Sequence, residues 1–131
     1  MIPVTGGIDI RGDLATVGAY LGHMPNLTEW TTFFQAVDGE KDGRFQVQSV
    51  MGPIETWITG TESAGARRYV IHSLIRGQEE EAELDLQEHG GHVAVRFTVN
   101  LPPHVDEDVV VGQRNEMAEE LVQLKRLLEA S

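Results

Sequence analysis

Residues 81–100 read EAELDLQEHGGHVAVRFTVN, and this stretch decides the fold. On each side of Gly90-Gly91, apolar and polar side chains alternate with a period of two. That period is typical of a β-strand with one buried face, whereas a helix would need a period of 3.6. Two glycines between alternating runs predict a two-residue hairpin turn. The inward side chains of this antiparallel hairpin are expected to be Ala82, Leu84, Leu86, Val93, Val95, Phe97 and Val99.

The segment before the hairpin predicts further antiparallel strands. From residue 35 onward, glycine-containing turn signals recur roughly every ten residues, which is the spacing of a meander. Two of the runs between these turns are less regular. YVIHSLIR at 69–76 is apolar on both faces, and ETWITGT at 55–61 directs Trp57 away from the row that holds Ile54 and Ile58. We therefore expect a six-strand meander in which one strand is covered on both faces or borders a cavity.

A strand and two short helices are predicted ahead of the meander. Apolar residues alternate over 4–10, which indicates a first strand. The period changes at Asp13, a good N-cap residue, and a helix is predicted over 13–22. Pro25 and the asparagine after it can then open a second short helix that carries Trp30.

The C-terminal part of the chain predicts one long helix. Leu101-Pro102-Pro103 ends the last strand, because proline cannot donate a hydrogen bond to the ladder. Three acidic residues at 106–108 suit a helix N-terminus, so the helix is predicted over 106–129, with a weak stretch at 109–112. Its apolar stripe consists of Met117, Leu121, Leu124 and Leu128. We expect this stripe to face the inward side chains of the hairpin.

Length and charge narrow the class of protein. The chain has 131 residues and a mass of 14.5 kDa, which predicts a single α+β domain over 1–131. It holds 21 acidic and 10 basic residues, for a formal net charge of −11. Such a field repels polyanions, so we expect no nucleic-acid partner and no electrostatic docking on an anionic membrane.

Missing residue types and motifs exclude other chemistry. The chain has no cysteine, which rules out disulfides, thiolate nucleophiles and cysteine-ligated zinc. No apolar run approaches the roughly 18 residues of a membrane span, and the N-terminus lacks the regions of a signal peptide. No Ser-His-Asp order, phosphate loop or dinucleotide fingerprint is present. We therefore expect a cytoplasmic protein without a cofactor.

Four features carry a resemblance to a known superfamily. Val17 lies where the first helix of that superfamily has a buried valine, and Trp30 where a tryptophan often follows its short helices. VDGEKDGRFQVQSVMG at 37–52 is similar to its strand-turn-strand with paired glycines, and ELVQLKRLLE at 120–129 to its terminal helix. Over nearly its whole length the chain thus resembles the SRPBCC superfamily, which includes START-like and polyketide cyclase-like proteins.

The resemblance implies a helix-grip fold. In such a fold, a curved antiparallel sheet of about seven strands wraps around a long C-terminal helix, and two short helices follow the first strand. It also implies an apolar cavity between sheet and helix that binds a lipid, sterol, hormone or polyketide, with catalysis of cyclisation or dehydration in a few members. The superfamily has no universal catalytic motif to carry over. The main competing architecture, an NTF-like cone, places its helices mostly first, whereas here the longest helix comes last.

Five side chains are candidates for lining that cavity. Trp30 and Phe34 lie where the short helices should cover one end of the sheet, with ordinary core packing as the alternative. Trp57 and Tyr69 combine large rings with a polar group, which suits a mixed pocket as well as sheet packing. His72 could bond a ligand or act as acid or base if it faces the cavity; otherwise it is a half-buried, hydrogen-bonded histidine.

The remaining polar candidates have simpler interpretations. The glycine turn would place His89 and His92 opposite each other in solvent, with only Glu88 nearby, so we expect no metal site there. In the acidic run at 79–85, alternation places Glu81, Glu83 and Asp85 on a solvated face opposite Leu84, rather than in a carboxylate pair for catalysis. His23 precedes a proline in a loop and would border the cavity mouth or lie exposed without a role.

Three classes of function remain open. The first is a carrier or sensor that holds an apolar small molecule in the cavity. The second is an enzyme of the cyclase or dehydratase kind, for which His72 is the central acid–base candidate. The third is a module with a filled core that binds a protein partner. The cavity is expected to open between 22–34, the Gly112 end of the last helix and the sheet near Trp57 and Tyr69. The oligomeric state and the identity of the ligand do not follow from the sequence.

Overall fold

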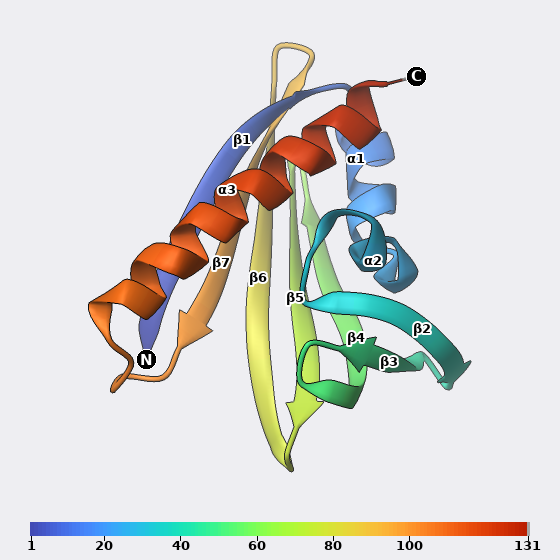
Figure 1. Ribbon diagram of the computed structural model, residues 1–131. Helices are drawn as coiled ribbons and strands as arrows, with labels where there is room; N and C mark the ends of the chain where they lie inside the picture. Colours follow the sequence, from blue (N-terminus) through green and yellow to red (C-terminus); the bar gives the residue numbers. More distant parts are fainter. Residues whose placement is uncertain (131) are drawn as a thin grey trace.

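The computed structural model describes residues 1–130 as one antiparallel sheet with helices on one of its faces (Figure 1). The strands are β1 (Ile2–Arg11), β2 (Phe34–Lys41), β3 (Arg44–Ser49), β4 (Gly52–Ser63), β5 (Ala66–Ile75), β6 (Gln78–His89) and β7 (His92–Leu101). The helices are α1 (Leu14–Leu21), the 3-10 turn η1 (Met24–Asn26), α2 (Leu27–Trp30) and α3 (Glu107–Glu129). This architecture confirms the predicted fold class.

The sheet is an open meander of six strands with the first strand of the chain added at one edge. Its order is β1-β7-β6-β5-β4-β3-β2, and each neighbouring pair is antiparallel. Only β1 leaves the sequential order, because it pairs with β7 in a register that joins Ile2 to Leu101 and Arg11 to His92. The six strands from β2 to β7 follow one another as the recurrent turn signals predict.

The β6–β7 hairpin has the predicted register. His89 pairs with His92 across a turn formed by Gly90 and Gly91, whose φ angles are +54° and +82°. Positive φ at both central residues is the type I′ requirement that glycine meets without strain. The inward row of this hairpin lies in the core, where Leu84, Leu86, Val93, Val95 and Phe97 are buried.

The first helix begins where its cap residue predicts. The carboxylate of Asp13 accepts hydrogen bonds from the backbone nitrogen and the hydroxyl of Thr16, at 2.8 and 3.0 Å. The helix ends at Gly22, and its buried face holds Leu14, Val17, Gly18 and Leu21. It lies against β5, β6 and β7, so it covers the central strands of the sheet.

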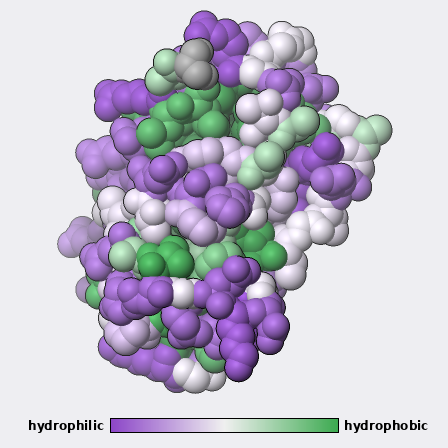
Figure 2. Space-filling view, turned by 90° about the vertical axis from the view of Figure 1, so that its right-hand side faces the viewer, coloured by the Kyte–Doolittle hydropathy of each residue, from purple (hydrophilic) through white to green (hydrophobic). Residues whose placement is uncertain are grey.

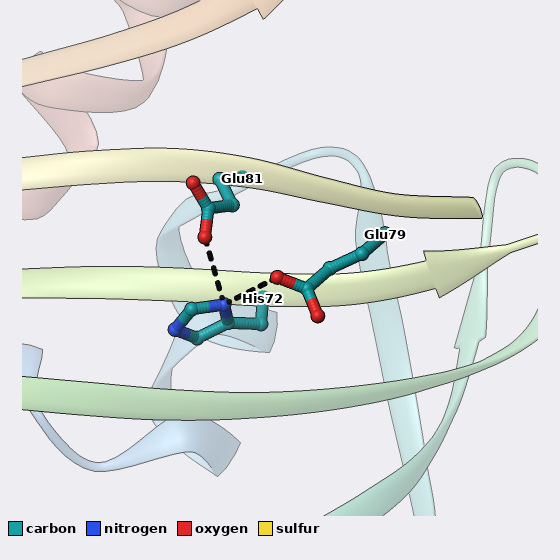
Figure 3. Close-up of side chains that lie close together, drawn as sticks. All are labelled: His72, Glu79 and Glu81. Carbon is teal, nitrogen blue, oxygen red and sulfur yellow. Dashed lines mark hydrogen bonds and ion pairs between the residues drawn. The ribbon is translucent and has the colours of Figure 1, made fainter.

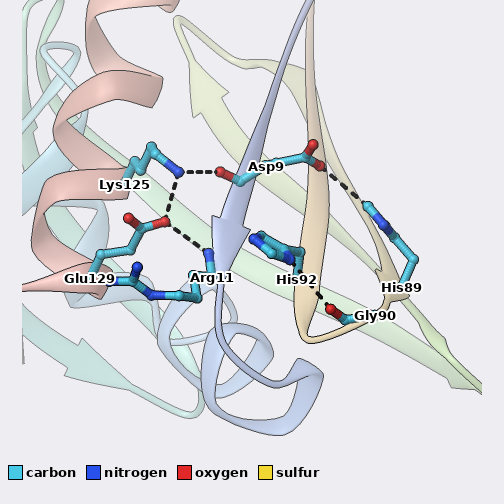
Figure 4. Close-up of polar contacts among 7 residues, drawn as sticks. All are labelled: Asp9, Arg11, His89, Gly90, His92, Lys125 and Glu129. Atoms are coloured by element: carbon cyan, nitrogen blue, oxygen red, sulfur yellow. Dashed lines mark hydrogen bonds and ion pairs between the residues drawn. The ribbon is translucent and has the colours of Figure 1, made fainter.

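The long helix lies mainly along β1. An added Cβ at Gly6 of β1 would lie 2.9 Å from Met117 Sδ and 3.2 Å from a methyl carbon of Leu121, so the missing side chain lets α3 approach the strand. At the other end of the helix, Lys125 Nζ donates to the carbonyl oxygen of Asp9 at 2.7 Å (Figure 4). Glu129 accepts from the same ammonium group and from a backbone nitrogen of β1. These contacts fix the C-terminal end of α3 on the edge strand.

The helical cover differs in detail from the expectation. The C-terminal helix was expected to face the whole β6–β7 row, but α1 and α2 share that cover, and Trp30 of α2 packs against Phe97. The stretch 109–112 is helical throughout, and Phe34 begins β2 rather than extending the short helix. One helix is too narrow to cover a sheet of seven strands, so the short helices are needed to bury the centre of the sheet.

The surface is mixed in character. Figure 2 views the side on which α1, α2 and β2 lie, and there apolar side chains form separate areas between hydrophilic ones. Within residues 1–130, no helix combines the length and the apolar character that a membrane crossing requires.

The packing of α3 on β1 can be tested with one pair of variants. Leu121 is buried against Gly6, whereas Val122, the next residue, is 43% exposed. We expect Leu121→Ala to lower the free energy of unfolding by about 2–5 kcal/mol through lost burial and a residual cavity. Val122→Ala should change it by less than about 0.5 kcal/mol. Urea denaturation of both variants measures the difference, and equal effects would mean that α3 does not pack as described.

Candidate functional site

Trp30 lies at the centre of the interior between the sheet and the helices. The single turn of α2 positions it, the residue is 2% exposed, and its ring meets Phe97 edge-on with 5.3 Å between centroids. Within residues 1–130, the indole nitrogen Nε1 has no hydrogen-bond partner. A buried N–H group without an acceptor is uncommon in folded proteins. The interior therefore holds one donor that the protein itself does not satisfy.

Glu120 is a buried carboxylate in the same region, where α3 meets α2. It is 6% exposed, and one of its oxygens accepts from the backbone nitrogen of Thr32 at 2.8 Å and from its hydroxyl at 3.3 Å. The Thr32 hydroxyl also bonds Glu116. Burial raises the pKa of Glu120, and the nearby charge of Glu116 raises it further, while the bonds from Thr32 oppose the shift. The group is thus an interior carboxyl that resists ionisation.

Glu120 was not predicted from the sequence, although a signal was present. On the helical wheel, residue 120 lies next to Met117 (i−3) and Leu124 (i+4), at the border of the apolar stripe. A charged residue in such a position is buried only when it has a partner. The partner, Thr32, is distant in sequence, so only the folded structure identifies it.

Tyr69 closes the gap between α1 and the sheet. Added Cβ atoms at Gly22 of α1 and Gly60 of β4 would each lie 2.8 Å from the Tyr69 ring, and one at Gly18 would lie 3.0 Å from its hydroxyl oxygen. Three glycines therefore leave the space that the ring occupies. Burial raises the pKa of Tyr69. The ring is half-buried, so it lies between the interior and solvent.

Trp57 and His72 lie on the opposite, outer face of the sheet. They are direct neighbours on β4 and β5, and their rings stack with 5.2 Å between centroids and 7° between planes. The guanidinium of Arg44 lies 3.8 Å from the Trp57 ring centroid. His72 Nε2 is 2.8 Å from the hydroxyl of Thr59. These two residues form a stacked group on a strand surface that the helices do not cover.

The five candidate residues are therefore divided between two places. Trp30, Phe34 and Tyr69 belong to the interior, whereas Trp57 and His72 do not line it. The reason is the strand alternation: Trp57 has the opposite parity from the buried Ile54, and His72 the opposite parity from the buried Ile71. The expected cavity mouth near Trp57 is corrected accordingly, because that ring faces away from α3.

The other histidines lie at the surface. His89 and His92 face each other across the hairpin with 6.4 Å between ring centroids, and His89 pairs with Asp9 at 3.3 Å (Figure 4). His92 contacts only the carbonyl of Gly90 among the polar groups described. His23 is exposed ahead of η1. This placement agrees with the hairpin interpretation of the two glycines.

The two best-defined hollows of the described residues lie outside the core. One is an open trough of about 1130 Å³ that crosses the outer face from β1 to β4 and is bordered by Arg68, Asp85 and Arg96. The other, of about 450 Å³, lies on the solvent side of α3 beside Val122. Neither of these two hollows lies between the sheet and α3.

Comparison with known proteins identifies the fold. No family model matches the sequence, and no curated protein matches it. An Aha1 dimer from Colwellia psychrerythraea has a similar structure, with a TM-score of 0.70 and 18% identity over 98% of this chain and 97% of that one. A START superfamily protein from Mycobacterium smegmatis gives a TM-score of 0.69 and 10% identity over 98% and 97%. CalU16 from Micromonospora echinospora gives 0.63 and 18% over 97% and 74%.

These likenesses define the class of structure. The chain has an SRPBCC-type helix-grip fold, as its sequence resemblance implies. Identities of 18% and below carry the fold and no activity. The function must therefore be argued from the interior and from the outer face of this chain.

The raised pKa of Glu120 predicts a pH dependence of stability. Its ordinary value is 4.5, and in the folded state it is higher, so the folded protein holds this proton more tightly than the unfolded chain does. As the pH rises from the ordinary value through the folded one, Glu120 therefore contributes less stability. Glu120→Gln removes the titration and keeps an acceptor for Thr32, so its stability relative to the unmodified protein should increase from pH 4.5 to neutral pH.

Denaturation curves at several pH values measure this difference. Glu119→Gln, an exposed change on the same helix, is the matched control and should show no such trend. A pH-independent difference for Glu120→Gln would mean that its carboxyl is not desolvated as described.

Proposed function

We propose that the protein binds an apolar small molecule in the interior between the sheet and its helices. The ligand class is a lipid, a sterol or a polyketide-like compound that carries at least one hydrogen-bond acceptor. The site is the region of Trp30, Phe34 and Tyr69, to which Glu120 is added. The fold supports this proposal, since the apolar faces of sheet and helices meet there.

The unsatisfied indole N–H of Trp30 carries the proposal. Leaving a buried donor without a partner costs about 1–3 kcal/mol. A carbonyl or hydroxyl oxygen of a ligand would accept this bond and recover that energy. The surrounding surface, which includes Phe34 and Phe97, is apolar. One polar anchor in an apolar lining is the usual composition of a small-molecule site.

Tyr69 provides the route into the interior in this proposal. Its ring rests on the backbone of three glycines and separates α1 from β4. Rotation of this one side chain would open the gap without breaking the sheet. Because glycine presents no side chain, an apolar ligand could occupy the same space in contact with backbone atoms.

Binding without chemistry is favoured over a cyclase or dehydratase activity. The alternative enzyme needs an acid or base inside the interior, and His72 lies on the other face. Glu120 is inside, but Thr32 bonds its Oε2 and holds the carboxyl group beside the end of α2, which suits a positioning role. The third possibility, a partner-binding module with a filled core, is an outcome of the experiment below.

The test follows the indole resonance of Trp30 as the site and that of Trp57 as the control. Each indole N–H gives one resonance in a ¹H–¹⁵N spectrum, and Trp57→Phe assigns them. The ligands are a panel of long-chain fatty acids, sterols and aromatic polyketides. We expect a binding compound to shift the Trp30 indole proton downfield, because its N–H gains an acceptor, and to leave the Trp57 resonance in place.

Native mass spectrometry of the purified protein supplies an independent reading. A co-purified apolar compound that is retained by Trp57→Phe and lost from Trp30→Phe would support the proposal. If the panel leaves both indole resonances unchanged and no compound co-purifies, the ligand proposal is wrong. The partner-binding alternative would then take its place.

A further inference from the structure

Three potential metal ligands converge on the outer face of the sheet, away from the interior site. His72 Nδ1 lies 3.2 Å from Glu79 Oε2 and 3.2 Å from Glu81 Oε2 (Figure 3). One ligand atom from each residue lies within 4.8 Å of the other two. Glu81 is the direct cross-strand partner of His72. Glu79 lies two residues before Glu81 in β6, on the same face of the strand. The arrangement comes from two adjacent strands, so the sheet itself holds it in place.

The imidazole of His72 is oriented by its neighbours. Its ring stacks on Trp57, and its Nε2 is 2.8 Å from the hydroxyl of Thr59. If Nε2–H donates to Thr59, Nδ1 presents its lone pair to the two carboxylates. A partner on the second ring nitrogen is the usual way in which proteins fix the tautomer and direction of a ligating histidine. The side chain is only 13% exposed, which limits its other rotamers.

The charges of the two glutamates are otherwise uncompensated. Across residues 1–130, the ion pairs of Glu79 and Glu81 are made with His72 alone. Arg68, the basic residue further along the same face, is paired with Glu83 and Asp85. Both carboxylates would attract a cation placed between them and the imidazole nitrogen.

The distances suit a metal ion. Zinc binds nitrogen and oxygen ligands at about 2.0–2.2 Å, so two ligands of one ion lie roughly 3.0–3.5 Å apart. Both Nδ1-to-oxygen separations fall in that range. A single proton on Nδ1 cannot point along both lines at once, whereas the half-exposed glutamate side chains can adjust to bring both of their oxygens onto one ion. Imidazole favours zinc and its transition-metal neighbours over magnesium or calcium.

We propose that His72, Glu79 and Glu81 bind a divalent transition metal ion, with zinc as the representative. Three protein ligands leave at least one coordination position for water or for an oxygen of another molecule. Both glutamates are about half exposed, so the open position faces solvent. This site is independent of the interior ligand, because the two lie on opposite faces of the sheet.

The experiment is a calorimetric titration of the untagged, chelator-treated chain with zinc chloride. We expect one zinc ion per chain. Glu79→Gln and Glu81→Gln keep the size of each side chain and remove its charge, and each should weaken binding by at least about tenfold. Glu83→Gln, on the same face of β6, is the matched control. His89→Ala/His92→Ala tests whether the hairpin histidines bind the metal instead, and both controls should retain the wild-type affinity.

Fluorescence gives a second reading of the location. In Trp30→Phe, Trp57 is the remaining tryptophan, and it stacks on His72. Cobalt, a paramagnetic substitute for zinc, should therefore quench its emission at one equivalent, and prior addition of zinc should prevent the quenching. Loss of zinc binding in His89→Ala/His92→Ala, unchanged affinity in Glu79→Gln/Glu81→Gln, or no zinc uptake at all would overturn the proposal.

Discussion

Alternation along the strands separates two chemical environments in this protein. Successive side chains point to opposite faces of the sheet, so a strand such as β5 presents Ile71 to the helices and His72 to solvent. The helices cover only one face, and the core depends on that assignment of sides. Every polar group of interest on the strands is consequently placed by its parity. Glu81 is on the outer face for the same reason that Leu84 is inside.

The interior combines dense packing with incomplete hydrogen bonding. Glycines at 6, 22 and 60 let α3 and the Tyr69 ring approach the backbone closely, which fills space that a helix-grip fold can otherwise leave empty. Trp30 nevertheless keeps an unpaired N–H, and Glu120 keeps a carboxyl group away from water. Both features are unfavourable for a core whose only task is stability. The proposed ligand site would account for both features.

The sequence predicted the β6–β7 hairpin and the long helix because each has an uninterrupted period. Both elements bury one face only, so the apolar positions reveal the geometry. The same reasoning failed for Trp57 and His72. β5 is apolar on both faces, and Trp57 is a large apolar ring on the solvent side of β4, so hydrophobicity could not say which side the helices cover. Glu81 was correctly placed on the outer face, but the convergence of Glu79 and Glu81 on His72 depends on strand register, which local patterns do not encode.

The position of β1 has a kinetic consequence. Every other strand pair joins neighbours along the chain, whereas β1 and β7 join residues 2 and 101. Closing so long a loop is entropically costly, and non-local pairing slows folding. The meander can form from local contacts, but α3 packs chiefly on β1 and cannot dock until that strand has arrived. The two ends of the chain are therefore expected to fold together, as the last cooperative step.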